Sequence, residues 1–183
     1  YATNAALHTK LPYDPATDLR PVGPFGTQPY LLIANTQLGA KSLAELTARL
    51  KARPGGLTYG SAGTGTGTHF LAEKFRLATS LEGTHVPYKG GPEATTDVIA
   101  GRIDYWFPPI SIALAAVQEG KVAPIAVTGT KRSGLPPHVP TMIEAGLAGF
   151  EVSFWSGVWV PSKTPDAIVS KLSVDIATAV SSP

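Results

Sequence analysis

YGSAGTGTGTHF, residues 59–70, contains four glycines and four serine or threonine hydroxyls within twelve positions. The segment LTYGS at 57–61 is a short apolar run of the kind that predicts a buried strand. The segment THFLAEKFRLA at 68–78 places apolar side chains three or four positions apart, which predicts a helix. The glycine-rich stretch is therefore predicted to be the loop at which a strand turns into a helix.

The same alternation of strand and helix continues on both sides of this loop. Helix starts are marked by capping residues at Ser42, Thr141 and Thr164. Strands are expected at 30–34, 57–61, 84–88, 103–107, 122–129 and 150–160, and helices at 43–52, 68–78, 91–101, 110–120, 140–147 and 164–180. Strands that alternate with helices of this length predict an α/β fold with a mostly parallel sheet.

The composition of the chain excludes several classes of binding partner and cofactor. The chain has 183 residues, of which 43% are hydrophobic, so it can bury a sizeable core. Its formal net charge is +2 and only 15% of its residues are charged, which argues against nucleic acid and anionic membranes as partners. With no cysteine, disulfides and thiolate metal sites are excluded. The histidines at 8, 69, 85 and 138 lack metal-ligand spacing, so we expect neither a metal nor another cofactor.

The glycine-rich loop has the chemistry of an anion site. Backbone N–H groups at the start of a helix lack intrahelical partners, and the helix macrodipole adds partial positive charge there. Gly63, Gly65 and Gly67 would let the backbone approach a ligand closely. Hydroxyls that could bind an oxygen or cap the helix are those of Ser61, Thr64, Thr66 and Thr68. The sequence matches neither a Walker loop nor a dinucleotide-binding loop, which leaves two alternatives: a seat for another anion, or a glycine-rich turn with ordinary capping.

His69 lies in the first turn of the predicted helix. A charged imidazole is disfavoured by the macrodipole at that position, so the pattern favours a neutral, structural histidine. An enzyme that used Ser61 or Thr66 with His69 would need an oriented acidic or basic partner. The chain has neither a Gly-x-Ser-x-Gly elbow nor a His-Glu-x-x-His motif, so we do not expect catalysis.

Two further loops follow predicted strands. VPYKGG at 86–91 would lie at the same sheet edge as the first loop if the strands are parallel, with the Tyr88 hydroxyl and the amides of Gly90 and Gly91 facing a ligand. The alternative is a simple turn, with Lys89 as a solvated flank. DYWFPPISI at 104–112 also joins a strand to a helix, and Pro108 and Pro109 stiffen it.

Four segments together resemble the solute receptors of tripartite tricarboxylate transporters, the Bug family. They are LPYDPATDLRPV at 11–22, SAGTGTGTHFLAEKF at 61–75, HVPYKGGPEATTDVIAGRIDYWF at 85–107, and residues 125–172, and they follow one another in the family's order. The resemblance implies a type II periplasmic binding protein, in which two α/β lobes close over a small carboxylate without catalysing a reaction. It also implies a periplasmic location and membrane transporter subunits as partners. A sensor of the same fold that feeds a signalling partner is the alternative.

The resemblance also assigns ligand-binding residues. They are Ser61, Gly63, Thr64, Gly65, Thr66 and His69 in the first loop, Tyr88, Lys89 and Gly90 in the second, and Phe107 and Pro108 in the third. Pro108-Pro109 departs from the family's usual Asp-Asn after the phenylalanine, which puts the ligand contact at that place in doubt.

The resemblance finally predicts the organisation of the chain. Residues 26–154 would form the second lobe complete, and residues 1–25 and 155–183 would be remnants of the first lobe. The family's secretory signal and the first loop of lobe one would precede Tyr1. Residues 22–26 and 154–160 would cross between the lobes, and apolar strands there would lack partners. We therefore expect the chain to form a homodimer or to exchange these segments.

Overall fold

The computed structural model describes residues 10–53 and 56–181, which divide into two compact units. The larger unit comprises residues 28–153, and the smaller unit comprises the described parts of residues 1–27 and 154–183. Among the described residues, no helix combines the length and the apolar character needed to cross a bilayer.

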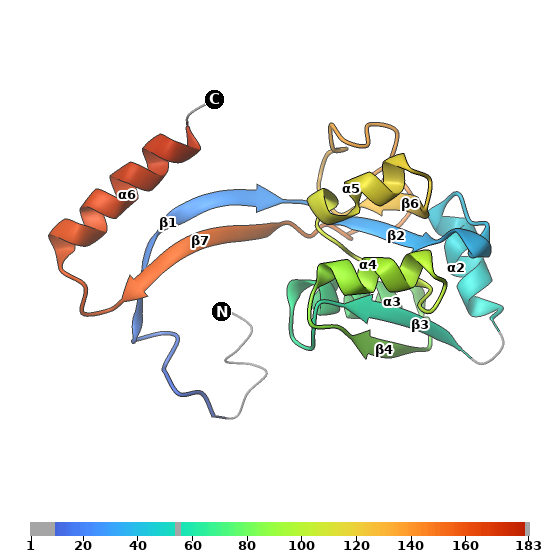
Figure 1. Cartoon of the computed structure of the whole chain (residues 1–183), viewed down its shortest axis with the longest axis horizontal. Helices are drawn as coiled ribbons and strands as arrows, with labels where there is room; N and C mark the ends of the chain where they lie inside the picture. Colours follow the sequence, from blue (N-terminus) through green and yellow to red (C-terminus); the bar gives the residue numbers. More distant parts are fainter. Residues whose placement is uncertain (1–9, 54–55, 182–183) are drawn as a thin grey trace. The chain divides into compact units, whose positions relative to one another are not determined.

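A five-stranded sheet in the order β4-β3-β5-β2-β6 forms the larger unit (Figure 1). The strands are β2 (Leu31–Asn35), β3 (Leu57–Ser61), β4 (Gly83–Pro87), β5 (Tyr105–Trp106) and β6 (Val122–Val127). β3 is parallel to β4 and β5, whereas β2 is antiparallel to β5 and β6. The sheet is therefore mixed: β3, β4, β5 and β6 run in one direction, as a mostly parallel sheet requires, and β2 runs against them. The chain enters β2 at the edge where β3, β4 and β5 end, so β2 has to run in the opposite direction.

Helices cover both faces of this sheet. They are α2 (Leu43–Lys51), α3 (Gly67–Thr79), α4 (Gly91–Ile99) and α5 (Ile110–Gln118), with a 3-10 turn, η1 (Thr36–Leu38), after β2. Figure 1 shows α4 and α5 on one face and α3 on the other. The two helices α3 and α4 lie on opposite faces because β4 and β5 flank β3 on opposite sides, and right-handed crossovers place the connecting helices accordingly.

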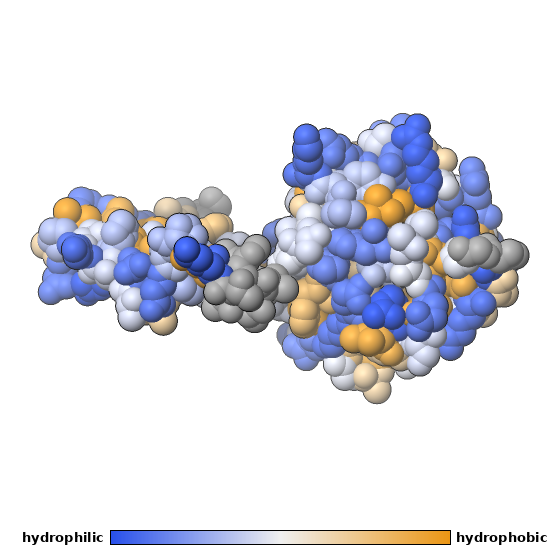
Figure 2. Space-filling view, turned by 90° about the horizontal axis from the view of Figure 1, so that it is seen from below, coloured by the Kyte–Doolittle hydropathy of each residue, from blue (hydrophilic) through white to orange (hydrophobic). Residues whose placement is uncertain are grey.

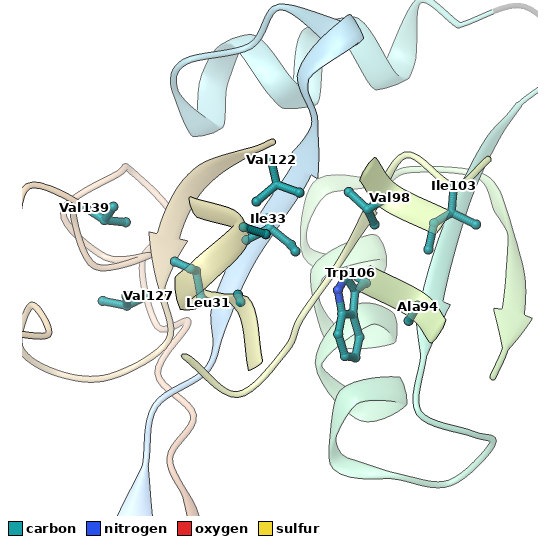
Figure 3. Close-up of a cluster of buried hydrophobic side chains, with 11 residues drawn as sticks. Leu31, Ile33, Ala94, Val98, Ile103, Trp106, Val122, Val127 and Val139 are labelled. Carbon is teal, nitrogen blue, oxygen red and sulfur yellow. The ribbon is translucent and has the colours of Figure 1, made fainter. Parts of the chain in front are cut away.

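β5 supplies the centre of a core on each face. Trp106 is fully buried beside Ile33, Val98 and the small residues of α4 and α5 (Figure 3). Tyr105, the neighbour of Trp106, packs edge-on against Phe75 of α3, at a centroid distance of 5.3 Å. Successive strand residues point to opposite faces, so the dipeptide Tyr105-Trp106 anchors both layers.

A buried carboxylate joins three strands at the edge where β3 begins. The Asp104 side chain is 1% exposed, accepts a hydrogen bond from the Thr58 amide at 2.7 Å and pairs with Arg53. Its backbone amide donates to Thr58 and its carbonyl accepts from Asn35, each at 2.9 Å. Asp104 therefore ties β2 and β3 to the residues that enter β5.

Two predicted elements differ from the structure. The helix expected at 140–147 is only a turn, although Thr141 and Glu144 form both hydrogen bonds of the capping box, at 2.8 and 3.0 Å. Gly146 adopts φ +101°, a left-handed conformation that stops the helix after one turn. The strand expected from residue 150 begins at Phe154, because Phe150 is buried in the aromatic core and the Val152 amide donates to the Thr128 carbonyl.

The smaller unit consists of β1 (Leu19–Gln28) paired with β7 (Phe154–Pro161), and α6 (Asp166–Val180). The Ser162 amide donates to the Asp18 carbonyl at 2.8 Å. α6 buries only Val169 among its described residues. Its N-cap is Pro165, which has no side-chain cap, so the cap expected at Thr164 does not form. Large apolar side chains that stay exposed in this unit are Phe25, Trp155, Ile168, Val174 and Val180. Figure 2 shows hydrophobic residues as separate patches among hydrophilic ones.

Candidate functional site

The loops after β3 and β4 lie side by side at one edge of the sheet, the carboxyl edge hereafter. Ser61, the last residue of β3, is in register with Pro87, the last residue of β4. The Tyr88 amide donates to the Ser61 carbonyl at 2.9 Å and continues the ladder into the loops. β5 is also parallel to β3, with Tyr59 in register with Tyr105, so its following loop reaches the same edge.

The glycine-rich loop is held in shape by its own side chains. Thr66 is the N-cap of α3, and its hydroxyl accepts from the His69 amide and donates to the Gly63 carbonyl at 2.7 Å. Thr68 Oγ1 accepts from the Ala62 amide at 2.9 Å. The capping role that the sequence predicted for these hydroxyls is therefore confirmed for Thr66. Gly63 and Gly65 adopt φ +121° and +80°, which explains why glycine occupies both positions.

Side chains occupy some of the loop's backbone donors and leave others without a hydrogen-bond partner. The Gly63 amide donates to Ser61 Oγ at 3.1 Å, and the Gly65 amide donates to His69 Nδ1 at 3.1 Å. The amides of Thr64, Gly67 and Thr68 make no hydrogen bond within the described part of the chain. Three donors at the start of a 13-residue helix are therefore available to an anion.

Ser61 and Thr64 have different roles. The Ser61 side chain is fully buried, and its hydroxyl is used by the Gly63 amide and by His85 Nε2 at 2.7 Å. Thr64 is exposed, and its hydroxyl has no partner among the described residues. Of these hydroxyls, that of Thr64 belongs to an exposed residue, while those of Ser61 and Thr66 shape the loop.

The second loop presents backbone groups more than side chains. The Tyr88 hydroxyl donates to Asp97 Oδ2 at 2.7 Å, and the Lys89 amide donates to Glu93 Oε2 at 3.2 Å. Burial and the Asp97 carboxylate raise the pKa of Tyr88 well above its ordinary value, so this hydroxyl stays protonated. Gly90 is the N-cap of α4 and has no side-chain cap. Its amide is unpaired within the described residues.

The third loop contributes little that is polar. Phe107 is fully buried and packs against Phe75 and Phe150, with centroids 5.7 and 6.3 Å away. Pro108 is buried too, and its carbonyl accepts from the Leu31 amide at 2.9 Å. Ligand contacts by Phe107 and Pro108 stay a prediction, while their role inside the larger unit is packing.

Sequence reasoning missed two residues at the carboxyl edge. His85 of β4 bonds Ser61, a residue 24 positions away that no local spacing connects to it. Thr128 follows β6, is fully buried, and exchanges hydrogen bonds with Tyr30 and Val152. A polar residue at the end of an apolar strand was the available signal for Thr128. Thr128 therefore joins the segment that enters β2 to the segment that precedes β7.

The charged groups behind the loop form a small network. The Tyr59 hydroxyl donates to Glu73, which also accepts from Arg76 at 3.0 Å. Burial opposes ionisation of Glu73, but the bonds from Tyr59 and Arg76 outweigh it and hold the pKa of that carboxyl below its usual value. Burial, together with Glu73, raises the pKa of Tyr59 to about 12. Glu73 is therefore a carboxylate at neutral pH.

The arrangement does not pair Ser61 with His69 as the catalytic alternative would need. Ser61 pairs with His85 and not with His69, and it has no exposed surface from which to reach a substrate. No group of three histidine or acidic side chains within residues 10–53 and 56–181 could hold a metal ion.

The comparisons with known proteins identify the family of the chain. The whole chain, residues 1–183, matches the model of the tripartite tricarboxylate transporter family receptor. A curated relative from Agrobacterium vitis, a UPF0065 protein in the TAR-I ttuE-ttuC' intergenic region, is 36% identical over 100% of this chain and 53% of its own length. The chain thus spans about half the length of that relative.

Two solved structures from Rhodopseudomonas palustris share the fold. Rpa4515 with adipate is 34% identical, with a TM-score of 0.89 over 96% of this chain and 58% of the other. MatC with bound malate is 32% identical, with a TM-score of 0.88 over 98% of this chain and 61% of the other. The predicted fold class, an α/β lobe of a periplasmic binding protein, is confirmed. The chain belongs to the tripartite tricarboxylate transporter family of receptors.

Proposed function

We propose that this chain is part of an extracytoplasmic receptor that captures a small carboxylate, without catalysis, and delivers it to a membrane transporter. The observation that carries the proposal is the set of unpaired amides of Thr64, Gly67 and Thr68 at the start of α3. Such amides bind anions because they point outward along the positive end of the helix dipole.

The contrast between helix starts supports the same conclusion. α2 begins at the opposite edge of the sheet, where Ser42 accepts from the Glu45 amide at 3.2 Å and Glu45 accepts from the Lys41 amide at 2.8 Å. At the carboxyl edge, the N-caps of α4 and α5 are Gly90 and Pro109, and neither helix has a side-chain cap. At α3 the Thr66 cap takes the His69 amide, and the amides of Thr64, Gly67 and Thr68 stay unpaired within the described residues.

The ligand class follows from the donors and from the relatives. Three hydrogen bonds to a carboxylate would contribute about 4.5–9 kcal/mol before the costs of association. Adipate and malate, the ligands named for the two Rhodopseudomonas structures, are both dicarboxylates. We therefore expect a small dicarboxylate, with one carboxylate held by the amides at α3.

A calorimetric and thermal-shift comparison tests the proposal. The probes are adipate, malate, the monocarboxylate hexanoate, and adipamide, which has the shape of adipate without its charge. A dicarboxylate at about 100 times its Kd should stabilise the protein by about 2.7 kcal/mol, whereas adipamide should not stabilise it. Equal stabilisation by adipate and adipamide, or by neither, would contradict the proposal. Detection of the full-length receptor in the cytoplasmic fraction would contradict its extracytoplasmic location.

A further inference from the structure

Two histidines form a continuous stack of rings with two tyrosines behind the glycine-rich loop. His69 of α3 stacks on His85 of β4 with centroids 4.0 Å apart and planes inclined by 15°. His85 stacks on Tyr59 of β3 at 5.4 Å, and Tyr59 stacks on Tyr105 of β5 at 5.6 Å. Both imidazoles are partly buried. The stack therefore links the loop to the sheet beneath it.

Both imidazoles bond to the glycine-rich loop, and the bond from a backbone N–H fixes the acceptor nitrogen of His69. The Gly65 amide can only donate, so His69 Nδ1, 3.1 Å away, has to be an unprotonated acceptor. Ser61 Oγ already accepts from the Gly63 amide, so its hydroxyl hydrogen is available to His85 Nε2 at 2.7 Å. In this arrangement His69 carries its proton on Nε2 and His85 carries its proton on Nδ1. With these tautomers neither ring carries a charge.

The charged groups around the stack come from each element packed against it. α3 contributes Glu73, whose Oε1 lies 4.0 Å from His69 Nε2, and Arg76, which pairs with Glu73. Tyr59 on β3 and Tyr105 on β5 are the titratable rings of the stack itself, and Glu82 before β4 acts on Arg76. Burial, together with the neighbouring His69, holds the pKa of His85 below its ordinary value of 6.5.

We propose that His69 and His85 are positioning residues whose neutral forms hold the glycine-rich loop in its anion-receiving arrangement, so that protonation releases the loop. A proton on His69 Nδ1 would face the Gly65 N–H, and two donors cannot bond each other. A proton on His85 Nε2 would leave the Ser61 hydroxyl hydrogen without its acceptor. Two charged rings 4.0 Å apart would also repel each other.

The proposal predicts a direction for ligand capture, and this consequence rests on the proposed function. Ligand binds the arrangement in which both imidazoles are neutral, so capture at mildly acidic pH should release protons. Affinity for adipate should therefore fall as pH falls, by about tenfold for each loop hydrogen bond that is lost. A receptor of this kind would release its ligand in an acidic surrounding.

NMR of the ligand-free chain tests the positioning role directly. The amide shifts of Gly63 and Gly65 are followed from about pH 8 to about pH 5, alongside the ring signals of His69 and His85. We expect the glycine shifts to follow the imidazole titrations, and the Gly65 amide to lose at least about tenfold in hydrogen-exchange protection on the acidic side. Glycine shifts that stay constant while the imidazoles titrate would overturn the proposal.

Matched variants separate the protonation of these two histidines from other effects of low pH on the protein. His69→Asn keeps an acceptor near the Nδ1 position, and His85→Gln keeps one near Nε2, but neither side chain titrates. In the double variant, the glycine shifts should not change with pH. The ratio of adipate Kd values at about pH 5 and pH 7.5 should be lower in the double variant than in the native chain, since the ligand's own ionisation is common to both.

The binding experiment and the NMR experiment test separate claims. Absence of adipate and malate binding at every pH would overturn the proposed function, while the glycine titration would still decide whether the histidines set the loop. Binding with the same pH dependence in the native chain and the double variant would overturn the histidine proposal and leave the carboxylate receptor standing.

Discussion

Replacing Gly67 with proline removes one of the three proposed ligand donors while keeping the helix. Gly67 is the first residue of α3, a position where proline is favoured because its missing N–H has no intrahelical partner. The preceding residue, Thr66, has φ −73° and ψ 164°, an extended conformation that proline permits in its neighbour. The Thr66 cap to the His69 amide does not involve the Gly67 N–H and is retained.

The expected loss of affinity follows from a single hydrogen bond. A hydrogen bond to a charged acceptor contributes about 1.5–3 kcal/mol, which corresponds to a Kd for adipate or malate raised about 10- to 150-fold. The free energy of unfolding without ligand should change by less than about 1 kcal/mol, because proline fits the backbone at this position.

The measurement is calorimetric titration with adipate and malate, accompanied by urea unfolding of each variant. Gly67→Ala is the matched control, since it adds a Cβ and keeps the N–H. The proline variant should bind at least about tenfold more weakly than the alanine variant. Equal Kd values in the two variants, with equal stability, would refute the assignment of the Gly67 amide as a ligand donor.

Four further predictions address stability and association. Asp104→Ala should lower the free energy of unfolding in urea by about 2–4 kcal/mol because a buried, hydrogen-bonded carboxylate is lost, and a shift below about 0.5 would contradict this. Thr128→Val should cost about 1–3 kcal/mol and Thr128→Ser clearly less, since serine keeps the hydroxyl that bonds both neighbouring segments. Hydrogen bonds from Tyr88 and Arg102 hold the pKa of Asp97 below its ordinary 3.8. The stabilisation that these bonds contribute should be complete above pH 3.8 and should fade as pH falls through the lowered pKa. Asp97→Asn should therefore weaken the dependence of the free energy of unfolding on pH in this acidic range. Light scattering at high concentration should give a mass greater than that of one chain. Trp155→Ser should lower this mass, because Trp155 is 57% exposed and would pack against another copy of the chain. A single-chain mass for the native protein would count against association.

Local hydrogen bonds were predictable because their partners lie within four residues of each other. The Thr66 cap, the capping box at Ser42 and the glycine-rich turn before α3 all follow from residue types at fixed spacings. The same reasoning overestimated the helix at 140–147, because the capping box formed but Gly146 ended the turn. Sequence patterns thus identified where helices start more reliably than how far they extend.

Tertiary pairing decided what the hydroxyls and histidines of the site do. Ser61 could have been a ligand group by its position in the loop, but β4 places His85 next to it and buries it. Tyr88 could have faced a ligand, but α4 brings Asp97 to its hydroxyl. Spacing along the sequence does not indicate these contacts, because each one joins residues from different strands, loops or helices.

The sequence by itself determined the alternation of strands and helices and the chemistry of the loop before α3, since both depend on interactions between near neighbours along the chain. Only the tertiary structure decided the strand order, the reversed direction of β2 and the stacking of His69 on His85. Strand order and register arise from burying apolar faces of distant segments against each other, and that choice is made by the packing of the whole unit.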